Sequence, residues 1–359
     1  MTFILPSSLS LAQTCIFVIS DNKDYLDIVD SSAECFPSSS GCNYSFVCSE
    51  GGRLSIISFR VESIKFNLAN FLLLSGNGLT SVNNMTINFV QSSDEKGIIK
   101  YTSQNSFSVV NLTARNSNSQ NCGLIYDLNG KLLSIKNSSF NTIKCLEDNG
   151  STLNGVIGDG NEIVICDTII ENCVAAKGYG GGINVVVQGT GKLRLGSNYG
   201  ATYFGKCAAM AEDTLGGYGG AVLLGCIDEG KDFVMTNLSF GLGESGNSAT
   251  FGGKNIIIEG TNLSQLVDFL SFNFSFSWKV SEDPDLQEMM GIENGDFLKL
   301  IPLALFFREK PIIGYVVGTN RGLDYYLCGD YDFPCPSLKY AGAAVFGSSK
   351  AVLRLMDTP

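Results

Sequence analysis

The chain has 359 residues, of which 44% are hydrophobic, a formal net charge of -11 and no histidine. This length can bury a core in one or two domains. The negative charge disfavours nucleic acid and anionic membranes as partners, and the missing imidazole excludes histidine-based triads and histidine metal sites. No stretch reaches the roughly 20 consecutive apolar residues that a membrane-spanning helix needs.

Residues 1–53 are predicted to form a small irregular cap with the first strands. Residues 1–20 have no basic region, and Pro6 interrupts their apolar stretch, so they fit a signal peptide cut after Ala12, a first strand or a truncated gene start. Twelve cysteines and eight Asn-x-Ser/Thr sites favour a secretory route. We therefore expect an extracellular or cell-surface protein, with at least two of Cys35, Cys42 and Cys48 paired.

A short motif recurs along residues 54–260, as in `NNMTINF`, `VNLTARN` and `KNSSFNT`. Each copy has an Asn or Asp in one slot, preceded by a short apolar strand, and the slots are spaced by 27, 26, 30, 31 and 39 residues. The slot residues are Asn84, Asn111, Asn137, Asp167, Asn198 and Asn237.

A glycine follows each slot and precedes another short strand, as in `GGGINVVV` and `GGAVLL`. Glycine and asparagine adopt positive φ at the least cost, so both kinds of position are expected at sharp corners. Stacked asparagine amides can also bond along the stack, where Asp167 can accept but not donate. The expected turn glycines are Gly97, Gly123, Gly155, Gly182, Gly220 and Gly253.

Two or three short strands per 25–30 residues, with no helical periodicity between them, predict an all-β parallel solenoid over residues 54–260. An antiparallel β-sandwich is the alternative, but sandwiches do not repeat the same corner at this spacing. Cys173 and Cys207 fall at similar positions in adjacent coils, where stacked free thiols are favoured over a disulfide.

The boxes `GGGI` (180–183), `GGAV` (219–222) and `IIEN` (169–172) resemble the repeats of polymorphic outer-membrane-protein type. The chain is thereby similar to the right-handed parallel β-helix, or pectin-lyase-like, superfamily. This resemblance implies a right-handed parallel β-helix but does not fix a function, because such solenoids host enzymes, adhesins and passive stalks. `FGKC` and `FGLG` depart from the pattern by placing Cys207 and Gly243 where the asparagine belongs.

The C-terminal part is predicted to hold a connecting segment with a short helix (261–311) and the start of a second β-helix-like unit (312–359). That unit is a truncated domain, a piece of a tandem array or a cap that folds back. Cys328 and Cys335 flank a proline-containing turn and are the expected disulfide. The chain is expected to be a monomer or part of such an array.

Insertions at one corner predict a binding face, because loops at equivalent corners of a solenoid project from one side. Exposed tyrosines beside carboxylates suit contact with a glycan or a surface protein. Asn149, in the inserted `LEDNGST`, is the expected glycosylation site, whereas the slot asparagines are expected to be structural. The expected binding face consists of Glu147, Asp148, Tyr179, Glu212, Asp213 and Tyr218.

The predicted function is therefore a non-enzymatic, adhesin-like or structural β-helix, without catalytic residues, cofactor or metal. A polysaccharide lyase is the alternative, and it would need calcium-binding carboxylates with a basic residue. A fragment of a larger surface protein is a third possibility. The candidates for the lyase site are Asp159, Glu162 and Asp167 with Lys192 or Arg194.

Overall fold

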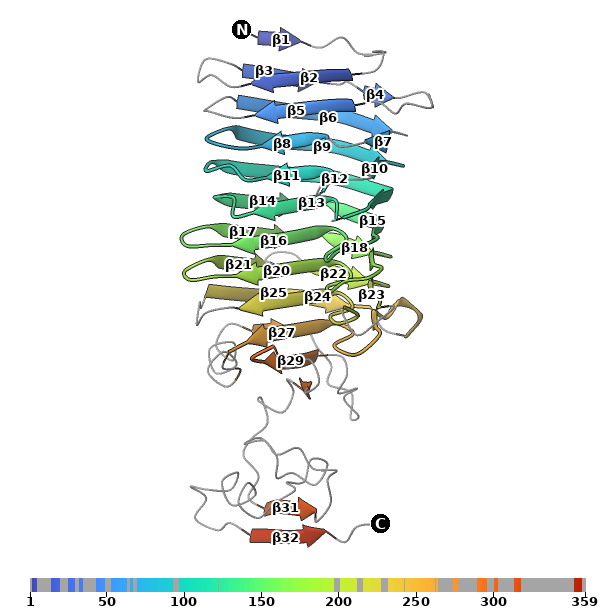
Figure 1. Ribbon diagram of the computed structural model, residues 1–359, viewed down its shortest axis with the longest axis vertical. Coiled ribbons are helices and arrows are strands. Elements are labelled where there is room, and N and C mark those ends of the chain that lie inside the picture. The colour runs from blue at the N-terminus through green and yellow to red at the C-terminus, as the bar shows by residue number, and fades with distance from the viewer. Residues whose placement is uncertain are drawn as a thin grey trace. The chain divides into compact units, whose positions relative to one another are not determined.

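The computed structural model is nearly all β, and its first unit, Met1–Pro302, stacks its strands in successive coils (Figure 1). Up to residue 66 the structure describes only the strands. Beyond residue 66 it describes residues 70–92, 97–121, 123–196, 201–211, 216–226, 232–241, 243–261, 263, 274–276, 289–295, 300–302, 313–317 and 352–356.

Two large sheets carry these coils. All described strand pairs within them are parallel except the last, in which β30 (Ile301–Pro302) runs antiparallel to β29 (Met289–Glu293). The 11-stranded sheet also contains β2 (Thr14–Ile19), β5 (Asn43–Cys48), β8 (Leu72–Leu74), β11 (Ile99–Tyr101), β13 (Ile125–Leu128), β16 (Leu153–Ile157), β20 (Ile183–Val187), β24 (Val222–Cys226) and β27 (Ile256–Gly260).

The 19-stranded sheet alternates with it along the chain and covers the rest of each coil. Its strands are β1 (Thr2–Ile4), β3 (Tyr25–Val29), β4 (Ser32–Glu34), β6 (Arg53–Glu62), β7 (Lys65–Phe66), β9 (Leu79–Asn88), β10 (Gln91–Ser92), β12 (Ser106–Ser119), β14 (Leu132–Lys136), β15 (Ser139–Cys145), β17 (Glu162–Cys166), β18 (Ile169–Glu171), β19 (Val174–Ala175), β21 (Lys192–Leu195), β22 (Thr202–Gly205), β23 (Ala208–Ala209), β25 (Asp232–Phe240), β26 (Ser248–Ala249) and β28 (Phe274–Phe276).

The core lies between the sheets because alternate residues of each strand point inward. In β12, Phe107, Val109 and Leu112 are fully buried, whereas Asn111 between them is exposed. The same residue types are stacked from coil to coil, so Phe107 pairs with Leu133 and Val109 with Ile135. The predicted all-β parallel β-helix is confirmed.

The predicted slot residues form one corner of each coil. This corner lies within a long strand in β9, β12 and β25, and between two shorter strands in the coils of β14 and β17. Asn84, Asn111, Asn137, Asp167 and Asn237 all have φ between 48° and 57°. The registers of β6, β9 and β12 place Ser58, Asn84 and Asn111 opposite one another, and Ser58 also has a positive φ of 53°. The left-handed conformation, rather than an amide, is therefore what the position requires.

The amides of this column bond along the stack only in part. Asn84 donates to the hydroxyl of Ser58 at 3.2 Å, whereas Asn111 donates to Oδ1 of Asn83, one residue before the slot, at 3.4 Å. Asn198 lies outside the described residues, at a corner with an insertion. Six residues separate Leu195 from Thr202 there, against two between their partners in the next coil.

A second left-handed column was not predicted. Phe89, Asn116, Thr142, Asn172 and Lys206 have φ between 49° and 56° and mark the next corner of successive coils. Since Ile170 pairs with Phe204, Lys206 rather than Cys207 stands where Asn172 stands. In the sequence alignment Cys207 of `FGKC` was placed opposite Asn172 of `IIEN`, one residue too far along the chain.

The expected turn glycines do not form one column. Gly155 lies inside β16, opposite Asp127 and Val185, and Gly150 makes that corner instead, at φ 59°. The equivalent corner residues in later coils are Gly180, Gly219 and Gly253, at φ 61°, 70° and 65°. Among the other expected glycines, Gly97 has φ 75°, while Gly123, Gly182 and Gly220 follow the corner and serve to bring backbones close together.

The two sheets extend on both sides of residues 54–260. Strands β1 to β5, before residue 53, already pair in the two sheets, and β28 and β29 continue them beyond residue 260. Residues 303–359 form a separate unit in which β31 (Ile313–Val317) pairs in parallel with β32 (Val352–Met356). Cys328 and Cys335 lie outside the described residues. No helix in the described part of the chain is long and apolar enough to span a bilayer.

Candidate binding surface

The loops that lead from the 19-stranded sheet into the 11-stranded sheet form the candidate surface. We call residues 146–150, 176–180, 216–219 and 250–253 the loop edge. Its backbones are bonded in a ladder: Gly150 N donates to Tyr179 O at 2.9 Å, Gly180 N to Tyr218 O at 3.0 Å and Gly219 N to Gly252 O at 3.2 Å. Because each loop rests on the next, residues far apart in the sequence are held as fixed neighbours.

An aromatic stack runs along the loop edge. The ring centroids of Tyr179 and Tyr218 are 6.1 Å apart, and those of Tyr218 and Phe251 are 5.3 Å apart. Tyr218 is only 6% exposed, because it packs with Leu223 and Ile257 in a small cluster outside the main core. The expectation of an exposed Tyr218 is therefore wrong, and Tyr179 is partly buried against the same cluster.

Two apolar side chains that were not predicted do face solvent here. Phe251 is 45% exposed at the end of the stack, and Met210 is 48% exposed beside the loop edge. The N–H of Ala211, next to Met210, donates a hydrogen bond to the Thr250 hydroxyl oxygen at 3.2 Å, which links the two segments. A signal existed in the sequence, since `FGG` at 251–253 repeats the aromatic–glycine step of `YG` at 179 and 218.

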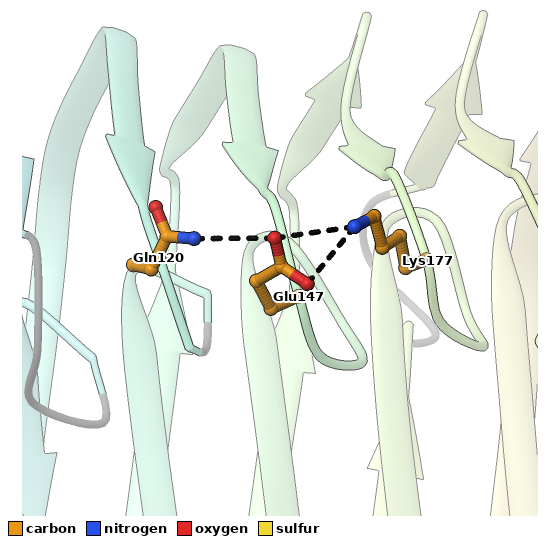
Figure 2. Close-up of polar contacts among 3 residues, drawn as sticks. All are labelled: Gln120, Glu147 and Lys177. Atoms are coloured by element: carbon orange, nitrogen blue, oxygen red, sulfur yellow. Dashed lines mark hydrogen bonds and ion pairs between the residues drawn. The ribbon is translucent and has the colours of Figure 1, made fainter. Parts of the chain in front are cut away.

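A row of polar side chains extends from Gln120 into the loop edge, where Glu147 and Lys177 lie (Figure 2). Gln120 Nε2 donates to Glu147 Oε1 at 3.2 Å, and Lys177 Nζ lies 3.2 Å from Glu147 Oε2. The three residues come from three successive coils and occupy one edge of the solenoid. Both charged side chains are about two-fifths exposed, at 41% each, so the pair contributes little to stability.

The structure brings together four of the six residues expected on the binding face: Glu147, Asp148, Tyr179 and Tyr218. Glu212 and Asp213 lie outside the described residues. Asp148 turns back to accept the N–H of Asn149 at 2.8 Å, so it stabilises the loop rather than projecting from it.

The Asn149 side chain has a structural contact of its own. Its Oδ1 accepts the N–H of Tyr179 at 2.8 Å and holds the two neighbouring loops together. A glycan attached at Nδ2 would leave this acceptor in place, so glycosylation of Asn149 stays a prediction.

The candidates for a lyase site are divided between two corners. Arg194 Nε lies 2.6 Å from Glu162 Oε1, and Lys192 lies opposite Glu162 in the register. Asp159 accepts bonds from the N–H and hydroxyl of Thr190, which lower the pKa of its carboxyl. Asp167 lies at the other end of β17, in the left-handed column. No group of three or more acidic, cysteine or histidine side chains placed to hold a metal occurs among the described residues.

The described cysteines Cys145, Cys166, Cys173 and Cys207 are buried free thiols. Cys173 and Cys207 are fully buried in adjacent coils, and burial raises the pKa of Cys207 well above its usual value. Burial likewise raises the pKa of Cys145 to about 12. Buried thiols are inaccessible to reaction partners, so these four residues act as small core side chains.

Comparison of the chain with protein-family models, with curated proteins and with solved structures gave no match. The candidate surface therefore has to be judged on its own geometry.

Proposed function

We propose that this β-helix is a non-enzymatic extracellular or cell-surface protein, adhesin-like or structural, that contacts a glycan or a surface protein through the loop edge. The observation that carries the proposal is the exposed end of the aromatic stack, where Phe251 and Met210 face solvent at the coils with the longest insertions. Aromatic and methionine side chains are the residue types enriched where proteins make contacts.

The rigidity of the surface supports this function. Phe251 lies on Tyr218, which is anchored in the cluster of Leu223 and Ile257. A ring held in place by a packed base loses little conformational entropy on binding. The row of Gln120, Glu147 and Lys177 offers the polar rim that contact surfaces of this kind usually have.

The extracellular setting is supported by the sequence alone, through its twelve cysteines and its glycosylation motifs. The structural role rests on the solenoid itself, since stacked coils provide a long scaffold that displays equivalent loops along one edge.

The test is binding of the full chain to a glycan array and to intact cells. The Phe251→Ala and Met210→Ser variants are expected to lose most of the binding. Phe89→Ala is the matched control, because Phe89 is 57% exposed at a different corner. Equal loss in the control, or no binding by the wild-type chain, would contradict the proposal.

Activity is tested separately by incubating the chain with acidic polysaccharides and calcium. Release of unsaturated products would replace the non-enzymatic role with that of a lyase. In that case Glu162→Gln and Arg194→Gln should reduce the activity while Phe251→Ala should not.

A further inference from the structure

An open hollow lies on the outer face of the 11-stranded sheet, and no residue of the aromatic stack is among its described lining residues. Its volume is about 430 Å³, and its lining residues are Val186, Gly225, Glu259, Gly260, Thr261, Asn294 and Gly295. This volume lies within the usual range for small-ligand sites, about 300–1,000 Å³.

The hollow exists because two glycines flank one carboxylate. Val186, Gly225 and Glu259 occupy the same outward position in β20, β24 and β27. A side chain at Gly225 would point between them, with its Cβ 3.3 Å from Val186 Cγ2 and 3.8 Å from Glu259 Oε2. On the other side, the Cβ position of Gly295 is 3.6 Å from Glu259 Oε1. Both carboxylate oxygens thus border space that a side chain would otherwise fill.

Among the described residues that line the hollow, Glu259 is the only charged one. Glu259 is partly buried, and this burial raises the pKa of its carboxyl above the usual value. The ion pairs of the described residues join Lys177 to Glu147 and Arg194 to Glu162, and neither involves Glu259. A partly desolvated carboxylate without a cation favours a ligand that brings a positive charge with hydrogen-bond donors.

We propose that this hollow binds a protonated alkyl amine, with its ammonium group on the Glu259 carboxylate and its carbon stem across Gly225 against Val186. The ammonium group supplies three donors, and Val186 supplies the apolar wall that an aliphatic stem requires. Thr261 and Asn294 border the opening and can accept a further bond from the ligand.

Other ligand classes fit less well. A calcium ion takes six to eight oxygen ligands, and the lining offers a single carboxylate. A neutral sugar ring is usually held by an aromatic face, and none of the described residues that line the hollow is aromatic. The net charge of -11 also raises the local concentration of cations rather than anions around the chain.

Two sources share this chemistry: the side chain of a lysine on a protein and a free alkyl amine. The test titrates the full chain with Nα-acetyl-lysine methylamide and with butylamine, followed by NMR. Nα,Nε-diacetyl-lysine methylamide and N-butylacetamide are the uncharged counterparts. At least one amine is expected to bind with a Kd on the order of 1 mM, and its acetylated counterpart about tenfold more weakly.

Variants show whether the hollow is the site. Glu259→Gln keeps the shape and should weaken binding at least about tenfold, whereas Gly225→Leu fills the hollow and should abolish binding. Glu244→Gln removes the same charge from the exposed 3₁₀ turn η1 (Gly243–Ser245) and should leave the affinity unchanged. Equal affinities of wild type and Glu259→Gln, an equal loss in Glu244→Gln, or no saturable binding of either amine would overturn the proposal.

The outcome is independent of the role proposed for the loop edge. Phe251→Ala should leave amine binding intact, and Glu259→Gln should leave adhesion through the aromatic stack intact. Failure of one proposal is therefore distinguishable from failure of the other.

Discussion

The early coils, from β8 to β12, and the late coils, from β16 to β29, stack in the same way but differ in the length of their loops. The repeat is 27 residues from Leu72 to Ile99 but 39 residues from Ile183 to Val222. The number of residues in an early coil is close to the minimum that two sheets and their corners require. The late coils contain longer loops, and Tyr179 and Tyr218 of these loops pack on the outside of the 11-stranded sheet.

This difference creates a second layer of packing in the late coils only. Tyr218, Leu223, Ile257, Met290 and Ile292 form a buried cluster on the outward side of the strands. At the outward position of an early strand, Lys100 is only partly buried. The inner core thus specifies the fold throughout, while the outer layer and its loops provide a surface that an early coil lacks.

The largest effect is expected where the late coils approach one another most closely. In Gly181→Ala the new Cβ would lie 2.2 Å from the carbonyl oxygen of Gly220 and 2.4 Å from that of Ala208. Neither backbone atom can move without separating two coils, so the variant should lose more than about 4 kcal/mol or fail to fold the late coils. Hydrogen exchange resolved by peptide should show lost protection in β20 and β24 but retained protection in β9 and β12.

Gly160→Ala is the matched control for this variant. Unlike Gly181, Gly160 has a positive φ, 67°, and its Cβ would meet only Lys131 Nζ, at 3.7 Å. This substitution should cost about 1 kcal/mol through its backbone conformation alone. Equal destabilisation by the two variants would mean that the close approach of the late coils is not what sets them apart.

The boundary between the two regions contains a buried carboxyl group, which gives the next largest effect. Asp127 is 1% exposed, faces Tyr101 and Gly155 in the register, and accepts one bond, from Gly130 N at 2.8 Å. Burial raises the pKa of Asp127 to about 8, although the hydrogen bond from Gly130 lowers it in part. Between about pH 4 and pH 8 the Asp127 carboxyl is therefore protonated in the folded state and ionised in the unfolded state.

The free energy of unfolding should fall as the pH rises from about 4 to about 8, by up to about 1.4 kcal/mol per pH unit from this group. In Asp127→Asn the side chain cannot ionise, so this slope should disappear. The free energy of unfolding of the variant should therefore rise relative to that of the wild type as the pH increases. Urea unfolding across this pH range measures the slope. A slope unchanged in Asp127→Asn would contradict the assignment.

Asp159→Asn is the matched control, because the two carboxyl groups have opposite pKa shifts. The bonds from Thr190 lower the pKa of Asp159, so its contribution is present at neutral pH and is lost only as the pH falls below about 4. The Asp159→Asn variant should therefore keep the wild-type slope between pH 4 and pH 8.

The period of the fold could be predicted from the sequence because a corner with positive φ admits few residue types. Asn84, Asn111 and Asn137 recur at that corner for this reason, and their spacing reports the coil length. The glycine corner was assigned less well, because glycine serves two purposes. Gly180 has a positive φ, whereas Gly182, in the same run of three, does not, and a side chain there would crowd Ala221 O and Ile170.

The candidate surface was predicted by position but not by exposure. The insertions showed which corner projects, and they placed Tyr179 near Tyr218. The burial of Tyr218 depends on Leu223 and Ile257 lying outward on two neighbouring strands, which the alternation of a strand cannot reveal when both its faces are apolar. The hollow beside Glu259 also escaped prediction, because it depends on Gly225 and Gly295 facing one carboxylate.

The smallest effect concerns a corner that both regions share. Asn111 has φ 57°, which a β-branched residue adopts only with strain, so Asn111→Val should cost about 1–2 kcal/mol. Asn111→Gly should be close to neutral, because glycine adopts this conformation freely and the amide bond that it removes, at 3.4 Å to Asn83, is long and exposed. Thermal unfolding, monitored by circular dichroism, gives the order of stability of the two variants.

Asn83→Val is the matched control, since Asn83 is exposed in β9 one residue before the slot and does not have a positive φ. Valine suits a strand position, so this variant should be neutral or slightly stabilising. If Asn83→Val were as destabilising as Asn111→Val, the side-chain amides rather than the left-handed backbone would hold the corner. The same substitution at Asn237, at φ 51° in a late coil, should cost as much as at Asn111, because this corner does not depend on the outer layer.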